Sequence, residues 1–135
     1  GKFAISVAQN VTNKNLTDRK PTLCDIRDRN NQILDEAIVI LYSTPRSYTG
    51  EDLVELHTHG SPYIVDQVIE ACVASGAEYA RPGEFSERAF LNGKMDLVQA
   101  ESIADLIASQ SSAQATAALA SMQGALSKEV HLLQE

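Results

Sequence analysis

Three stretches in the N-terminal half of the chain have the composition of β-strands. Residues 22–27 and 33–42 are separated by turn-forming residues at 29–32, which predicts a β-hairpin. The second stretch ends in a run of apolar residues at 37–42 that fits a buried strand. A shorter apolar run, Phe3–Val7, is also predicted to be a strand, and the polar residues 10–21 are predicted to form a loop.

The third stretch, residues 52–59, alternates along its whole length. The period of two assigns Val54, Leu56 and Thr58 to a core face. The opposite face then carries Leu53, Glu55, His57 and His59. A carboxylate and two imidazoles in one row are unusual for an otherwise apolar strand, so this face is a candidate site.

A helix is predicted to follow, with Ser61 as its N-cap, Pro62 in its first turn and Gly76 at its end. Its apolar stripe would consist of Val65, Val68, Ile69, Cys72 and Val73. Residues 77–80 are short and apolar enough to predict a brief strand.

Residues 81–97 interrupt this regular pattern. Pro82-Gly83 and Asn92-Gly93 predict two turns, and the eight residues between them have helical composition. Asp96 and Gln99 have the spacing of a capping box, so a further helix should begin at residue 97.

The remaining residues predict one or two closing helices, with a break at 110–112. The first apolar stripe would contain Val98, Ile103, Leu106 and Ile107, and the second Leu119, Met122, Leu126, Val130 and Leu133. These stripes need a helical partner. Together the patterns predict an α+β fold with an antiparallel or mixed sheet over residues 1–96, followed by the start of a helical bundle over residues 97–135.

The net charge of −7 and a pI near 4.9 argue against sequence-independent binding of nucleic acid. The sequence shows neither a membrane-spanning run nor a signal peptide, which favours a cytoplasmic protein without a membrane partner. Cys24 and Cys72 are expected to be reduced. Because both ends look like cuts, we expect a piece of a longer chain.

The chemistry of the strand face leaves alternatives open. His57 and His59, with Glu55, could bind a metal ion as part of a small hydrolase, or these polar groups could line a solvated cleft; we expect no metal. Glu55 could accept two N–H bonds from a pterin or purine, or form a salt bridge with Arg81 or Arg88.

The charges of residues 81–97 have their own alternatives. Arg88 lies four residues after Glu84 and could form a surface pair with it. Lys94 follows a glycine turn, where a fixed cation suits an anionic ligand group. The spacing around Asn92-Gly93-Lys94 does not match a P-loop.

Three motifs carry a family resemblance: Ser47–Glu55, His59-Gly60, and Arg81–Leu97 with Gln99-Ala100-Glu101. With them, residues 43 to about 125 resemble the N-terminal region of the MnmE (TrmE) family of tRNA-modifying GTPases. The opening departs from that family, which has a Gly-rich strand and an Arg-x-Ser-Gly segment where this chain runs from Gly1–Val7 into Ala8-Gln9-Asn10.

The resemblance implies an aminomethyltransferase-like domain that dimerises and binds a tetrahydrofolate derivative, 5-formyl- or methylene-tetrahydrofolate. It implies that Glu55 and Lys94 contact the folate. We further expect that His57, His59, Arg81 and Arg88 could line the site. It implies no catalytic residue in this chain, and it assigns GTP, Mg and K to a GTPase domain elsewhere. The implied partners are a second copy, the flavoprotein MnmG (GidA) and tRNA, whose wobble uridine is modified. The alternative is a structural dimerisation module that needs no ligand.

Overall fold

The structure is a computed structural model that describes residues 1–109 and 113–123. It divides into two compact units, Gly1–Tyr79 and Ala80–Glu135. This division reflects how the residues pack. The boundary between a folate-binding domain at 1–96 and a helical domain at 97–135 concerns function, and it stays a prediction.

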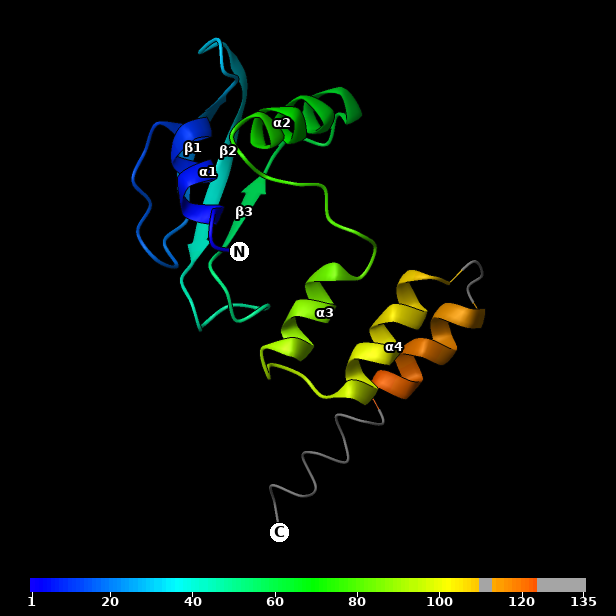
Figure 1. The fold of residues 1–135 in the computed structure, drawn as a ribbon. Coiled ribbons are helices and arrows are strands. Elements are labelled where there is room, and N and C mark those ends of the chain that lie inside the picture. Colours follow the sequence, from blue (N-terminus) through cyan, green and yellow to red (C-terminus); the bar gives the residue numbers. More distant parts are fainter. Residues whose placement is uncertain (110–112, 124–135) are drawn as a thin grey trace. The chain divides into compact units, whose positions relative to one another are not determined.

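The first unit is a three-stranded antiparallel sheet with two helices (Figure 1). Its strands β1 (Thr22–Arg27), β2 (Ile33–Tyr42) and β3 (Leu53–His57) lie in the order β1-β2-β3. β1 and β2 form the predicted hairpin, with Cys24 opposite Ala37. β2 and β3 pair with Ile40 opposite Glu55. Helices α1 (Ala4–Thr12) and α2 (Pro62–Ala74) both contact the sheet.

The predicted strand at Phe3–Val7 is wrong, because these residues begin helix α1. The helical spacing becomes visible only in a longer window. Buried Val7, Ala8, Val11 and Thr12 then recur at intervals of one, three and four residues along one helix face. The predicted loop is therefore wrong over residues 10–12, which belong to α1. Gly1–Val7 is also not a strand that could correspond to the family's opening strand.

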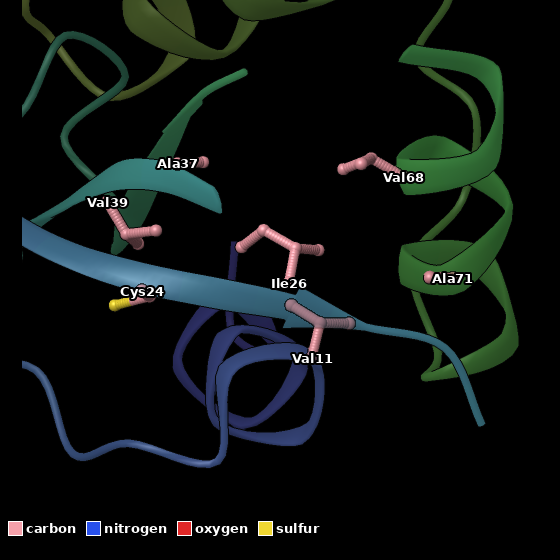
Figure 2. Packing of buried hydrophobic residues seen from close by; sticks show 7 residues of the cluster. All are labelled: Val11, Cys24, Ile26, Ala37, Val39, Val68 and Ala71. Atoms are coloured by element: carbon pink, nitrogen blue, oxygen red, sulfur yellow. The ribbon is translucent and has the colours of Figure 1, made fainter. Parts of the chain in front are cut away.

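The core of the first unit lies between one face of the sheet and the two helices (Figure 2). Ile26 and Val39 are fully buried, and Val11 of α1 and Val68 of α2 pack into the same cluster. Val54 and Leu56 of β3 pack against it, which confirms the predicted core face of that strand. The remaining buried members of the cluster are Cys24, Ala37 and Ala71.

The other face of the sheet is the outer face, formed by the alternate residues of each strand. Strand β2 was predicted to be buried along 37–42, but only Ala37, Val39 and Leu41 are buried there. Ile38, between them, is 45% exposed because it lies on the outer face. Strand alternation therefore continues through the apolar run.

Helix α2 begins and ends as predicted, with Pro62 following the N-cap Ser61 and Gly76 at a positive φ after the last turn. Its buried stripe differs from the prediction. Val68 and Ala71 are buried, whereas Ile69 and Val73 are exposed. Ala71 was missed because a small side chain contributes little to an apolar pattern, yet it allows the helix to approach the sheet closely.

The second unit contains α3 (Glu84–Leu91), α4 (Leu97–Ile107) and a helical segment at 113–123. Residues 77–80 form no strand, so that prediction is wrong. α3 coincides with the eight residues predicted between the two turns. The capping box of α4 is confirmed, since Asp96 accepts from the Gln99 N–H at 2.8 Å and the Gln99 side chain accepts from the Asp96 N–H at 3.0 Å.

The predicted break at 110–112 and the stripe residues Leu126, Val130 and Leu133 lie outside the described residues. Within the described part, a sheet and helices in one chain confirm the α+β class. No helix in that part is long and apolar enough to cross a membrane.

Candidate functional site

Glu55 and His57 lie side by side on the outer face of β3. Each is two residues from the next side chain on that face, so the strand itself brings them together. The His57 Nε2 atom lies 3.6 Å from the Glu55 Oε1 atom. The Glu55 side chain is 44% exposed and the His57 side chain 54% exposed. The carboxylate is thus accessible, which removes the large cost of a fully buried charge.

Tyr42 is a site residue that the sequence analysis missed. It lies on the outer face of β2, and the neighbouring Glu55 carboxylate raises the pKa of its hydroxyl. In the strand register Ile40 lies opposite Glu55 and Tyr42 is its diagonal neighbour. Tyr42 was missed because residues 37–42 were predicted to be buried throughout. The period of two would have assigned Tyr42 to the outer face.

His59 does not share the face of Glu55 and His57, which corrects the prediction. β3 ends at His57, and the His59 Nδ1 atom lies 2.7 Å from Oδ1 of Asp35. The His59 backbone N–H donates to Oδ2 of the same carboxylate at 2.9 Å. Asp35 lies in β2 opposite Ile26, at the end of the core face. The backbone hydrogen bond from His59 holds the pKa of Asp35 below its usual value.

The Asp35 contacts attach the β3–α2 connection to the sheet. The Asp35 carboxylate thus contacts both the backbone N–H and the ring of His59. The His59 ring is 73% exposed. No group of three or more His, Cys, Asp or Glu side chains in residues 1–109 and 113–123 is placed to hold a metal ion.

In the second unit, Arg81 and Arg88 form ion pairs with acidic residues of α3. Arg81 Nε lies 3.2 Å from Glu84 and its Nη2 lies 3.0 Å from Glu87. Arg88 Nη2 lies 3.2 Å from the other oxygen of Glu84, which confirms the predicted pair. The backbone hydrogen bond from Arg81 and its side chain lower the pKa of Glu84. These charges brace the first turns of α3, and that contact already occupies both arginines.

Lys94 has a fixed backbone and an exposed side chain. The Gly93 N–H donates to Phe90 O at 3.0 Å and the Lys94 N–H donates to Ala89 O at 2.8 Å, which is a Schellman motif at the end of α3. Gly93 takes φ +73°, a conformation that glycine adopts without strain. The motif therefore sets where the Lys94 side chain leaves the helix end.

The structure thus brings together Glu55, His57 and Tyr42 in the first unit, and Arg81 with Arg88 in the second. Glu55 and Lys94 belong to different units. An open depression of about 510 Å³ lies elsewhere on the first unit, along β1 and the end of α1, with Lys14, Arg27 and Glu36 among its lining residues. Its mixed charges include an Arg27–Asp25 pair at 3.5 Å, so it does not favour one ligand charge.

The first unit is an α+β unit whose outer sheet face carries the polar residues Glu55, His57 and Tyr42. Comparisons with known proteins define its family. The family described as "GTP-binding protein TrmE N-terminus" matches residues 1–94. The chain is 49% identical over 133 residues to the "tRNA modification GTPase MnmE" of Legionella pneumophila (strain Paris), covering 98% of this chain. Proteins with the same description from Pseudomonas putida (strain W619) and Francisella philomiragia subsp. philomiragia are 49% and 47% identical over 135 residues.

The chain therefore belongs to the TrmE N-terminus family. It spans 30% of the length of these curated relatives.

Proposed function

We propose that this chain is the folate-binding and dimerisation part of a cytoplasmic tRNA-modification GTPase. The relatives' shared description supports the tRNA-modification context. In this proposal GTP hydrolysis, with GTP, Mg and K, belongs to the part of those proteins outside the matched region. The whole protein would modify the wobble uridine of tRNA together with the flavoprotein MnmG.

The observation that carries the folate proposal is the Glu55 carboxylate on the outer face of the sheet. It is accessible, and it lies beside His57 and the diagonal neighbour Tyr42. A carboxylate in this position can accept two parallel N–H bonds from the ring N–H and amino group of a pterin. Ile40 opposite Glu55 and Leu53 beside it offer an apolar surface to the flat ring.

Lys94 is the second residue that we propose contacts the folate. Its side chain is exposed and its backbone is fixed by the Schellman motif, so it can meet an anionic or carbonyl oxygen without further loss of backbone freedom. We propose His57, His59, Arg81 and Arg88 as further residues that line the folate site, with Arg81 and Arg88 remaining paired with Glu84.

The test is calorimetric titration of the chain with 5-formyl-tetrahydrofolate. Glu55→Ala and Lys94→Ala should each weaken binding by about 1.5–3 kcal/mol, roughly 10- to 150-fold, because each removes a hydrogen bond to a charged group. Glu36→Ala, an exposed outer-face residue of β2, and Lys2→Ala, at an exposed position before α1, serve as matched controls that should bind as the parent does. Equal affinity of all variants would remove the folate assignment.

A ligand-independent dimerisation module is the second candidate, favoured by the apolar character of the outer face. Leu23 is 56% exposed and Ile38 is 45% exposed on this face, which a second copy could cover. Light scattering with and without folate separates the candidates. A dimer that forms equally well in both conditions, with no measurable folate binding, favours the structural module.

A further inference from the structure

Arg19 stands out because its backbone takes φ +58°, which a residue other than glycine rarely adopts. Three contacts hold it there. The Arg19 N–H donates to Leu41 O at 2.7 Å, Asp18 forms a bridge with Leu41, and the Ser43 N–H donates to Asp18 Oδ1 at 2.7 Å. The segment at 18–19 is thus built onto the end of β2.

The side chain of Arg19 reaches the candidate site. Its guanidinium carbon lies 5.5 Å from the centroid of the Tyr42 ring, within the range of a cation–π contact. Tyr42 in turn is the diagonal neighbour of Glu55, and the Glu55 carboxylate raises the pKa of the Tyr42 hydroxyl. A cation, an aromatic ring and a carboxylate therefore follow one another across this end of the sheet.

Arg19 also belongs to a local group of positive charges in an acidic chain. Its Nη2 donates to the backbone carbonyl of Arg46. The Ser43 backbone N–H lowers the pKa of Asp18 most, and both arginines lower it further. Lys20 is the next residue. We define Arg19, Lys20 and Arg46 as the basic cluster; all three are exposed, and Asp18 is the acidic residue among them.

The Arg19 guanidinium of the basic cluster has further N–H donors available for a ligand. The polar contact that the structure describes for the Arg19 guanidinium is with a neutral carbonyl, and a guanidinium carries five N–H donors. We propose that the basic cluster binds the glutamate tail of the folate, which is rich in carboxylates. The pterin ring of the same ligand would donate its N–H groups to Glu55. The inference rests on the proposed function and deepens it, because it assigns specificity for the glutamate tail of the folate.

Nucleic acid is the other polyanion that positive charges could attract, and the structure favours it less. Phosphate binding rewards an extended basic surface, whereas this cluster has three cations beside Asp18 and Glu55 in a chain of net charge −7. A short run of carboxylates matches the size of the cluster better.

The experiment compares three probes on the 135-residue chain: 5-formyl-tetrahydrofolate with one glutamate, its triglutamate form, and a tetrahydropterin without a tail. The parent should bind the triglutamate form about tenfold more tightly than the form with one glutamate. Arg19→Gln and Arg46→Gln should each reduce this preference by about two- to fivefold, because exposed ion pairs are weak. The affinity for the tailless pterin should stay unchanged.

Arg29→Gln, in the exposed turn between β1 and β2, is the matched control and should keep the full preference. Arg19→Lys keeps the charge and should restore most of it, which separates a charge effect from a local folding defect. Circular dichroism checks that each variant is folded.

Two results overturn the inference while leaving the folate proposal intact: Arg19→Gln keeps the tail preference, or it weakens tailed and tailless probes equally. Displacement of the triglutamate by oligouridylate, with RNA affinity lost in Arg19→Gln, would overturn it in favour of nucleic acid. If the parent binds none of the three probes, the proposed function fails, and this inference fails with it.

Discussion

The two compact units bury different kinds of side chain. In the first unit, the fully buried residues include Ile26, Val11 and Val39, which fill the space between sheet and helices. In the part of the second unit that the structure describes, residues 80–109 and 113–123, the buried residues are small, while large apolar side chains stay exposed. The buried ones are Ser86, Ala89, Ser102 and Ala118, and the exposed ones include Phe85, Leu91, Leu97, Val98 and Ile107.

The difference shows two ways of packing helices. Large branched side chains between a sheet and a helix remove much apolar surface from water, so the first unit contains its own source of stability. Small residues let helices approach closely, as at the Ser102 and Ser121 hydroxyls, which lie 3.2 Å apart. Close approach alone buries little apolar area. The described part of the second unit therefore relies less on burial of large apolar side chains than the first unit does.

The largest effect is expected from a cavity in the core of the first unit. Ile26→Ala should lower the free energy of unfolding by about 2–5 kcal/mol, because Ile26 is fully buried and its neighbours cannot collapse onto the gap. Leu97→Ala in the second unit is the matched control and should cost less than about 1 kcal/mol, since Leu97 is 53% exposed. Urea denaturation of both variants measures the difference, and equal losses would contradict the comparison.

A smaller effect is expected from the carboxylate at the edge of the same core. The folded-state pKa of Asp35 is lowered, so its contribution to stability is present above its ordinary pKa of 3.8 and is lost as the pH falls through the folded-state value. Asp35→Asn should therefore cost about 1.5–3 kcal/mol at neutral pH. The variant should also lose less stability than the parent upon acidification below about pH 4.

Denaturation across a pH series checks this prediction. Asp66→Asn, an exposed position on α2, is the control and should follow the parent. A parallel pH dependence of Asp35→Asn and the parent would show that the contact with His59 does not stabilise the folded state.

The smallest of these effects is expected where the second unit packs through small residues. Ser102 is 4% exposed, and its hydroxyl donates to Val98 O at 2.9 Å. Ser102→Leu should lower the stability by about 1–3 kcal/mol because the close approach leaves no room for a larger side chain. Ala104→Leu, on the exposed side of the same helix, should be nearly neutral. Hydrogen exchange on α4 distinguishes the two, and equal protection would contradict close packing at Ser102.

Local patterns predicted much of the fold. The hairpin of β1 and β2, the start of α2 at Ser61-Pro62 and the capping box of α4 each depend on residues close in sequence. The Glu84–Arg88 pair follows from helical spacing in the same way. Phe3–Val7 was misread because five residues are too few to separate a helical period from a strand period, and Ala71 was missed because alanine carries a weak apolar signal.

The sequence by itself determined the family, the α+β class, the core face of β3 and the position of Glu55 on the opposite face. Those features depend on local periodicity and on motifs that are contiguous in the chain. The tertiary structure decided that Tyr42 and Arg19 lie beside Glu55 and that His59 turns to Asp35. The physical reason is that these neighbours are set by the register between strands and by a loop held on the end of β2, and both depend on pairing between distant segments.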